Sequence, residues 1–192
     1  MRRLTVLVDM DDTIENLLFA WVTWLNRIYQ RDVQCDDIKS WDICAAYPGL
    51  SYEEVYGLLR LEAFWETVEP LPGAAEGLRS FLEAGHEVYI VTATTPEAVL
   101  PKMEKVLFRY FPFLTWRNVV ITENKQLLRG DVLIDDGIHN LEGGAYEKIL
   151  VTAPYNESYA AEKNGMLRVH NWDEIRAAVE ALANNGGNDA AR

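Results

Sequence analysis

The stretch LTVLVDMDDTI, residues 4–14, decides both the fold and the chemistry to be expected of this chain. It starts as a run of β-forming residues and ends in three aspartates within four positions, Asp9, Asp11 and Asp12. A short continuous apolar run is typical of a parallel strand that is covered on both faces. Because carboxylates crowded at the end of a buried strand repel one another, we expect a cation beside them.

Apolar runs of the same kind recur along the chain and alternate with helical patterns. The helical patterns lie at residues 72–85, 95–111 and 171–182, and Pro101 either kinks the second helix or marks its true start. This alternation predicts a doubly wound, Rossmann-like α/β fold with a parallel sheet. The runs that we interpret as strands are LTVLVD (4–9), HEVYIVT (86–92), VVIT (119–122), DVLIDD (131–136), KILVT (148–152) and MLRVH (166–170).

Residues 15–70 interrupt this alternation, because they contain two helical patterns and no convincing strand. The second pattern begins at Ser51, where Glu54 completes a capping box, and runs to about Phe64. In the first pattern five apolar residues share one face: Leu17, Leu18, Trp21, Leu25 and Ile28. We therefore predict an α/β core of residues 1–14 and 71–184, a small helical cap of residues 15–70 inserted after the first strand, and a flexible tail of residues 185–192.

Composition and charge narrow the class of protein. The 192 residues suit one domain with a modest insertion, and the formal charge of −12 argues against nucleic-acid polymers and anionic membranes as partners. Two cysteines, Cys35 and Cys44, favour reduced thiols over a disulfide framework. The first apolar run ends at Asp9, too early for a signal peptide, and no segment approaches the roughly 20 apolar residues of a membrane span. We expect a soluble, cytoplasmic protein.

Chemically active side chains stand at the carboxyl ends of four predicted strands. Besides the first aspartates these are Thr92, Lys125, Asp135 and Asp136. Parallel strands bring such residues to one edge of the sheet, where open α/β folds bind their ligands. Each residue alone has a simpler explanation, as a turn residue, a cap or a surface charge. Their coincidence at four strand ends favours a functional site.

A hard cation with oxygen ligands fits these carboxylates best. Mg²⁺ prefers carboxylates, waters and substrate phosphate oxygens, whereas His86, His139 and His170 are too scattered for a zinc site. A phosphate monoester is then the natural ligand, with Lys125 and the Thr92 hydroxyl holding its oxygens. A carboxylate beside the metal can attack phosphorus to form an aspartyl-phosphate. The aspartate two residues further on can protonate the leaving alcohol and then activate water.

The motifs DMDDT, the threonine that closes YIVT, Lys125 and VLIDD, in this order, resemble the four motifs of haloacid dehalogenase superfamily phosphatases. This resemblance covers nearly the whole chain. A narrower resemblance links the chain to the 5′(3′)-deoxyribonucleotidases. It rests on the initial DMD, the short helical cap, the phrase EPLPGA, the run VITENK followed by GDVLIDD, and the closing HNWDEI.

The resemblance assigns the groups that carry the reaction. Asp9 becomes the nucleophile and a Mg²⁺ ligand, and Asp11 the general acid and base, which also gives its backbone carbonyl to the metal. Asp136 becomes the third metal ligand. Asp135 would orient Lys125 or a metal-bound water. Asp12 receives no chemical role, and we expect it to form the turn at the strand end.

The resemblance also assigns the phosphate-binding groups and suggests a substrate pocket. Thr92, the amide of Ala93 and Lys125 would hold the phosphate, with Lys125 bridging it to the nucleophile. Trp41 aligns with a base-stacking aromatic residue of the family, and Leu17 stands where the family usually has phenylalanine. With Phe64, these two residues are our candidates for the pocket. For Trp21 and Trp24 a place in the core of the cap is favoured.

The resulting hypothesis is a Mg²⁺-dependent phosphatase that hydrolyses deoxyribonucleoside monophosphates. Two alternatives stay open: a phosphatase of the same superfamily for another small metabolite such as a sugar phosphate, and a non-catalytic phosphate-binding regulatory module. Bacterial receiver domains also combine Asp, Thr and Lys with a metal. However, their phosphorylated aspartate ends a later strand, and residues 15–70 have no place in them. A homodimer is compatible with the sequence, which does not reveal the oligomeric state.

Overall fold

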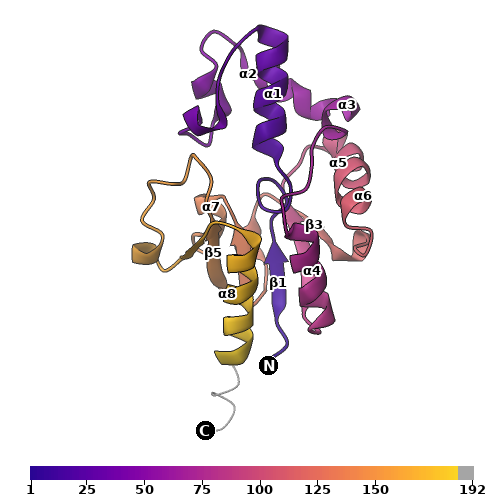
Figure 1. Cartoon of the computed structure of the whole chain (residues 1–192), viewed down its shortest axis with the longest axis vertical. Coiled ribbons are helices and arrows are strands. Elements are labelled where there is room, and N and C mark those ends of the chain that lie inside the picture. Colours follow the sequence, from indigo (N-terminus) through magenta and orange to yellow (C-terminus); the bar gives the residue numbers. More distant parts are fainter. Residues whose placement is uncertain (186–192) are drawn as a thin grey trace.

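The structure, a computed structural model, describes residues 1–185, and its centre is a six-stranded parallel sheet (Figure 1). The strand order is β3-β2-β1-β4-β5-β6, so β1 lies in the middle and the order reverses beside it. The predicted doubly wound parallel fold is therefore confirmed. The strands are β1 (Thr5–Val8), β2 (Glu87–Thr92), β3 (Val119–Ile121), β4 (Val132–Asp135), β5 (Glu147–Val151) and β6 (Leu167–Val169).

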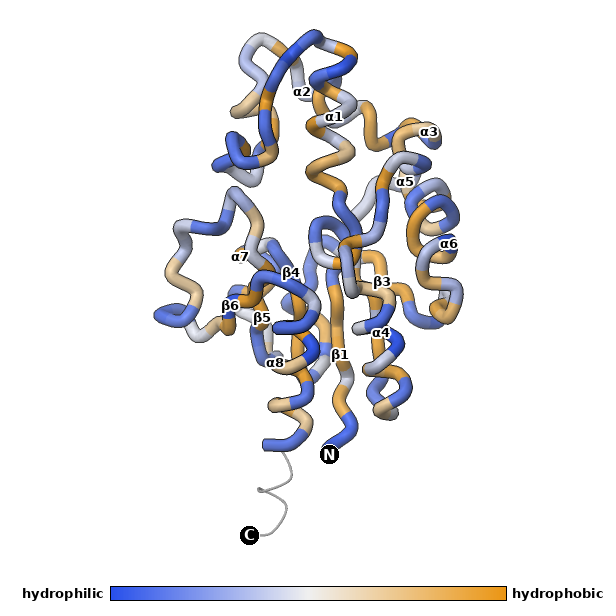
Figure 2. Tube along the Cα trace, in the orientation of Figure 1, coloured by the Kyte–Doolittle hydropathy of each residue, from blue (hydrophilic) through white to orange (hydrophobic). Residues whose placement is uncertain are grey.

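Two apolar clusters cover the two faces of the sheet, as its continuous apolar strands require. Alternate residues of β1 point to opposite faces, so Val6 joins the larger cluster and Leu7 the smaller one. The larger cluster packs under α4 (Ala74–Glu83) and α8 (Trp172–Asn185), and the smaller one under α7 (Ile138–Leu141). Figure 2 shows the hydrophobic strand β1 between these covering elements. Only the strand ends are left for polar chemistry.

The segment 15–70 is helical, as expected, and lies beyond the carboxyl end of β1 (Figure 1). The single helix expected from Ser51 to Phe64 is wrong, because a 3₁₀ turn that starts at the weak helix former Gly57 divides it. Ile28 does not share the buried face of the first helix, since it lies in the last turn and is 46% exposed. The elements of the segment are α1 (Leu17–Tyr29), α2 (Tyr52–Tyr56), α3 (Glu62–Trp65) and 3₁₀ turns at Cys35–Asp37, Ile43–Ala46 and Gly57–Arg60.

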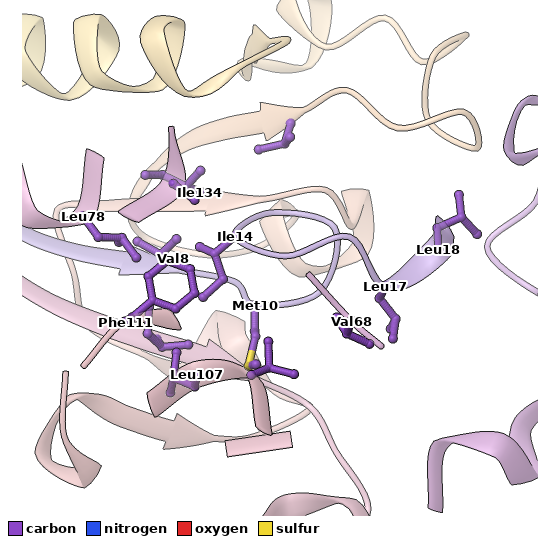
Figure 3. Close-up of a cluster of buried hydrophobic side chains, with 14 of the residues drawn as sticks. Val8, Met10, Ile14, Leu17, Leu18, Val68, Leu78, Leu107, Phe111 and Ile134 are labelled. Carbon is purple, nitrogen blue, oxygen red and sulfur yellow. The ribbon is translucent and has the colours of Figure 1, made fainter. Parts of the chain in front are cut away.

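One apolar cluster continues from the sheet into this helical segment. Figure 3 shows Val8 and Ile14 near the sheet and, further along the same chain, Leu17 close to Val68. Leu17 belongs to the same buried cluster as Val8. The helical segment is therefore seated on the sheet by shared apolar contacts, and the division into core and cap stays a prediction.

The two connections between the sheet and the helical segment are hydrogen-bonded to each other. The N–H of Asn16 donates to the carbonyl of Glu69 and the N–H of Leu71 to that of Ile14, each at 2.9 Å. Glu15 and Pro70 form an antiparallel bridge between these bonds. We call residues 14–16 and 69–71 the hinge ribbon. It lies directly after the aspartates of the opening motif.

The helix expected at residues 95–111 begins before Pro101 and changes its geometry after it. α5 (Pro96–Lys102) starts with a proline at a position where no N–H is needed. Pro101 lies inside α5 and lacks the N–H for the regular helical bond, and a π-helical turn (Met103–Leu107) follows. α6 (Phe108–Tyr110) completes the segment. Of the two alternatives left by the sequence, an irregular helix is therefore the correct one.

The last helix, α8, extends to Asn185, the first residue of the expected tail. The rest of that tail, residues 186–192, lies outside the part of the chain that the structure describes. Within residues 1–185, no helix has both the length and the apolar character that crossing a membrane requires.

His86 ties the start of β2 to the start of β1 in a way that requires a neutral imidazole. The backbone N–H of Leu4 donates to Nδ1 of the buried His86 at 3.2 Å. Protonated Nδ1 would be a donor facing another donor. Burial lowers the pKa of His86 below its usual value, against a smaller opposing influence of Asp131. The folded state therefore favours the neutral form.

We predict that this histidine makes the protein less stable in weak acid. The unfolded chain takes up a proton at His86 near pH 6.5 and the folded chain does so only at lower pH. The stabilisation is therefore present above about pH 6.5 and is lost as the pH falls below it. Urea unfolding at pH 7.5 and 5.5 measures the change.

His86→Asn provides the control, because its Oδ1 can accept the Leu4 N–H without titrating. We expect the wild-type protein to lose more free energy of unfolding than His86→Asn between the two pH values. His139 and His170 are exposed and are present in both proteins. An equal loss in the two proteins would contradict the assignment.

Candidate active site

A cavity of about 460 Å³ lies at the carboxyl end of β1, between the sheet and the helical segment. Register explains why the expected residues meet there: Val8 pairs with Ile90 of β2 and Ile134 of β4, so Asp9 emerges between these strands. Of the residues expected at the site, those that line the cavity are Asp9, Asp11, Leu17, Trp41, Ala93, Lys125 and Asp136. Thr92 and Asp135 are fully buried and contact the lysines described below, whereas Phe64 does not line this cavity.

Lys125 joins the nucleophile candidate to the late aspartate pair. Its ammonium donates to Oδ1 of Asp9 and, at 2.7 Å, to Oδ2 of Asp135, and its side chain is 2% exposed. Although burial opposes charge, the two carboxylates raise the pKa of Lys125 above its usual value, so the ammonium persists. Burial raises the pKa of Asp9 to about 7, and the charge of Lys125 limits the rise.

The two aspartates that end β4 have different partners. Oδ1 of Asp135 accepts hydrogen bonds from the N–H of Gly137 at 2.7 Å and from Asn140 at 3.0 Å, and its Oδ2 is held by Lys125. Oδ2 of Asp136 accepts a hydrogen bond from the hydroxyl of Tyr155, while its buried Oδ1 has no hydrogen-bond partner within residues 1–185. Protein donors therefore occupy Asp135 fully and leave one oxygen of Asp136 free.

These carboxylates can hold a metal ion. One oxygen each of Asp9, Asp135 and Asp136 lie within 4.8 Å of one another, and all three residues are buried. Burial, followed by the charges of Asp9 and Asp135, raises the pKa of Asp136 well above its usual value. A cation beside the free Oδ1 would stabilise the charged form of Asp136, which burial disfavours. An all-oxygen donor set suits a hard divalent ion. The distribution of free oxygens favours Asp136 over Asp135 as its ligand.

Asp11 pairs with a lysine that the sequence did not suggest. Its Oδ2 accepts a hydrogen bond from Nζ of Lys102 at 2.6 Å, and the same nitrogen donates to Oγ1 of Thr92 at 2.7 Å. Burial would raise the pKa of Asp11, but the charge of Lys102 outweighs it together with weaker influences, and the pKa is lowered. A signal was present: Lys102 lies four residues from both Ala98 and Val106, on the buried face of its helical segment.

Glu15, in the hinge ribbon, is a second group that sequence reasoning missed. It is fully buried, and neither carboxyl oxygen has a hydrogen-bond partner among the described residues. Burial and the neighbouring Asp11 raise the pKa of Glu15 well above its usual value and so favour its neutral form. Glu15 lies two residues before Leu17, just ahead of an apolar helical pattern, and nothing in that pattern predicts that Glu15 is buried.

Asp12 has the geometry of a turn residue. Its backbone is left-handed, with φ of 51°, and Oδ1 accepts the N–H of Leu18 at 2.9 Å in the first turn of α1. Aspartate and asparagine adopt this conformation more readily than most residues. These contacts agree with the turn expected there. Burial raises the pKa of Asp12 to about 7.

The helical segment supplies an aromatic and aliphatic wall to the cavity. Trp41 is 54% exposed, and its ring lies 4.6 Å from that of His139 and 5.3 Å from that of Tyr155, centroid to centroid. Phe64 instead is fully buried among apolar residues, with its ring 5.4 Å from that of Trp65. Trp41, on the helical segment, therefore contacts residues that follow β4 and β5, and Phe64 is part of the buried interior of the segment.

Comparison with known proteins assigns the family. Residues 2–184 match the sequence profile of the family described as "5′ nucleotidase, deoxy (Pyrimidine), cytosolic type C protein". The chain belongs to this family. The expected membership of the haloacid dehalogenase superfamily, close to its deoxyribonucleotidases, is thereby confirmed, as is the expectation of a phosphatase.

Individual relatives agree with this nucleotidase family. A 5′(3′)-deoxyribonucleotidase of Bacillus subtilis is 36% identical over 172 residues, which cover 88% of this chain and 95% of that protein. One from Clostridium acetobutylicum is 32% identical over 182 residues, covering 95% and 98%. Both alignments span nearly the whole of each relative, so the resemblance includes the helical segment as well as the sheet.

Solved structures of more distant hydrolases share the fold. A haloacid dehalogenase family hydrolase from Deinococcus radiodurans, with bound phosphate and sodium, aligns with a TM-score of 0.61 at 18% identity, covering 93% of this chain and 95% of that one. A hydrolase of the same superfamily from Bacillus subtilis, bound to magnesium, aligns with a TM-score of 0.60 at 12% identity, covering 93% and 99%. At these identities the likeness shows only that the chain shares the α/β fold of these two hydrolases.

We predict that the two late aspartates of this nucleotidase differ in their importance for metal binding. Asp136→Asn removes the carboxylate that has a free oxygen and should lower Mg²⁺ affinity by more than about 100-fold. Asp135→Asn keeps that oxygen and should have the smaller effect on affinity, while lowering thermal stability through the loss of an acceptor for Lys125. Isothermal titration calorimetry with Mg²⁺, without substrate, measures both affinities. A larger loss of affinity in Asp135→Asn would reverse the assignment.

Proposed function

We propose that the chain is a Mg²⁺-dependent 5′(3′)-deoxyribonucleotidase that hydrolyses deoxyribonucleoside monophosphates through an aspartyl-phosphate on Asp9. The observation that carries the proposal is the buried cluster of Asp9, Lys125 and Asp136 at the carboxyl end of β1, which faces Asp11 under an aromatic wall. Relatives that are 36% and 32% identical bear the name of this activity. We further propose that residues 15–70 act as a cap and that the enzyme works in the cytosol, as the description of its family states.

In this mechanism Asp9 and Asp136, with the backbone carbonyl of Asp11, hold the metal ion. When bound, Mg²⁺ would supply positive charge against which the carboxylates and the substrate phosphate can approach one another. Lys125 would hold a phosphate oxygen while it keeps Asp9 in place. Thr92 and the amide of Ala93, at the end of β2, are proposed to bind the remaining oxygens.

The reaction is proposed to proceed in two displacements. A carboxylate oxygen of Asp9 attacks phosphorus, the bond from phosphorus to the nucleoside oxygen breaks, and that oxygen takes a proton from Asp11. Asp11 has to enter this step protonated, against the charge of Lys102, which favours its ionised form. Water then gives a proton to Asp11 and attacks phosphorus. The bond from phosphorus to Asp9 breaks, inorganic phosphate leaves, and both aspartates return to their starting state.

The charges around the cavity support a substrate with a single phosphate. Lys125 is the one cationic side chain that lines it among the described residues, whereas Asp11, Asp12, Glu123 and Asp136 all contribute carboxyl groups. A second phosphate would lie against these groups. Monophosphates should therefore bind better than diphosphates.

The cap wall supports a nucleoside as the leaving group. Two of its aromatic polar atoms are already engaged: Nε1 of Trp21 donates to the carbonyl of Val55 at 2.7 Å, and the hydroxyl of Tyr56 donates to Asp42 at 3.2 Å. The surface offered to the ligand is therefore mainly apolar, with Trp41 as an exposed ring. Stacking of a base on such a ring contributes roughly 1–3 kcal/mol and tolerates different bases.

A panel of phosphates tests the substrate. We expect deoxyribonucleoside 5′- or 3′-monophosphates to give a kcat/KM at least about tenfold higher than sugar phosphates and deoxyribonucleoside diphosphates, because only they fit both the wall and the charge. Initial rates of phosphate release, with Mg²⁺ and with EDTA, measure this. A sugar phosphate as the best substrate would favour the alternative phosphatase, and no hydrolysis of any ester would favour a binding module.

Replacement of the nucleophile tests the mechanism. Asp9→Asn should lower kcat by at least about 1,000-fold, because an amide does not attack phosphorus. Asp12→Asn is the matched control, since asparagine tolerates the left-handed backbone and keeps an acceptor for Leu18. Circular dichroism and unfolding curves verify that both variants are folded. Retained turnover in folded Asp9→Asn would disprove the aspartyl-phosphate.

A further inference from the structure

Lys102 is the most deeply buried lysine among the described residues. It is 1% exposed, at the last position of α5, and the π-helical turn follows it. Lysine is almost never fully buried unless it is paired, so a lysine in this place needs partners. Its partners are two of the groups on which the proposed reaction depends.

The ammonium of Lys102 links the ends of two neighbouring strands. It donates at 2.6 Å to Oδ2 of Asp11, which follows β1, and at 2.7 Å to Oγ1 of Thr92, the last residue of β2. The ring of Trp65, on α3, lies 5.4 Å from Nζ, within the range of a cation–π contact. Carboxylate, hydroxyl and aromatic face together hold the charge in one place.

The two buried lysines divide the site between them. Lys125 pairs with Asp9 and Asp135, and Lys102 pairs with Asp11. Among the described residues no second cation pairs with Asp11, whose other oxygen, Oδ1, is buried without a partner. Lys102 therefore holds Oδ2 of Asp11, while Glu15 neighbours the same carboxyl group.

Lys102 also determines how the Thr92 hydroxyl can bond. Because Oγ1 accepts an N–H of Lys102, the hydroxyl hydrogen is directed to another acceptor, which in this structure is the carbonyl of Ala93 at 3.3 Å and in a complex would be a phosphate oxygen. One ammonium thus places a proton-transfer group and a phosphate-binding group at a fixed separation. Such positioning matters in catalysis because small displacements of reacting groups cost large factors in rate.

We propose that Lys102 is a positioning residue for the proton transfer: it holds Asp11 toward the leaving-group oxygen and fixes Thr92 beside it. This role rests on the proposed function, because it assumes that Asp11 protonates the alcohol that leaves phosphorus. Lys102 itself does not touch the reacting atoms. Its effect should therefore depend on how much the leaving group needs a proton.

Leaving groups of different acidity test this role. A nucleoside alcohol leaves as a poor alkoxide unless it is protonated, whereas p-nitrophenolate leaves well without a proton. Lys102→Met keeps the apolar stem and removes the ammonium. We expect it to lower kcat/KM about 100-fold for a deoxyribonucleoside monophosphate and less than about fivefold for p-nitrophenyl phosphate. Equal losses for the two substrates would overturn the proposal, since a purely structural role affects both alike.

Lys105→Met is the matched control. Lys105 belongs to the same helical segment and pairs on the surface with Glu62 and Glu66 of the cap, at 2.6 and 3.1 Å. Lys105→Met also removes one lysine charge, but this charge pairs with Glu62 and Glu66 and not with Asp11 or Thr92. We expect the ratio of the two kcat/KM values to stay within about twofold of the wild-type ratio. A change as large as that in Lys102→Met would attribute the effect to general charge and overturn the proposal.

A double-mutant cycle verifies that Lys102 acts through Asp11. In an Asp11→Asn background, Lys102→Met should lower kcat/KM for the nucleotide by less than about fivefold, as for p-nitrophenyl phosphate, because the proton-transfer group is already absent and only the contact with Thr92 is lost. Additive losses would overturn the proposal. If Lys102→Met does not fold, Lys102→Gln replaces it, since its amide can still donate to Asp11 and should keep part of the rate for the nucleotide.

Failure of this inference can be distinguished from failure of the proposed function. If the wild-type enzyme prefers another alkyl phosphate, the panel shows it, and the comparison with p-nitrophenyl phosphate is made with that ester. If the nucleotide is the best substrate and the ratio is unchanged in Lys102→Met, only the role of Lys102 is wrong.

Discussion

The buried carboxylates at the end of β1 require compensating positive charge, and the whole site depends on how it is supplied. Lys125 provides it for Asp9 and Lys102 for Asp11. Burial of an ion pair costs several kcal/mol in desolvation and is tolerated only with good geometry and additional hydrogen bonds. Asp136 keeps a buried oxygen without a donor among the described residues. The protein supplies two lysine ammonium groups, and the negative charge that they leave uncompensated at Asp136 can be balanced by a metal ion.

The sequence predicted the residues whose meeting follows from the sheet alone. Once β1 is placed in the middle of a parallel sheet, Asp9 and Asp136 must lie at one edge, because register and strand direction determine where each strand ends. Lys102 and Glu15 were not predicted, because they come from a helix end and a connection. Their approach to Asp11 depends on where α5 ends and on the crossing of two chain segments, which no strand pattern encodes.

The helical segment was harder to interpret for a related reason. Its short helices and 3₁₀ turns have no period long enough to show which side chains face the ligand and which face the core. Trp41 on an irregular stretch lines the cavity, whereas Phe64 on a short helix is buried. Family membership supplies the reaction, and the lining of this segment is where substrate preference must be determined.

The hinge ribbon joins the sheet to the helical segment that we propose as a cap. Its two chain crossings are hydrogen-bonded to each other, so they resist sliding past and separating from one another. If the proposed cap opens, these bonds would favour a rotation about the ribbon over a translation of the segment. A motion of that kind loses little conformational entropy when a ligand arrests it, so more of the binding free energy is left to discriminate between ligands. Because Glu15 of this ribbon forms a bridge with Asp11, the axis of such a rotation would pass beside the proposed acid and base rather than at a distance from it.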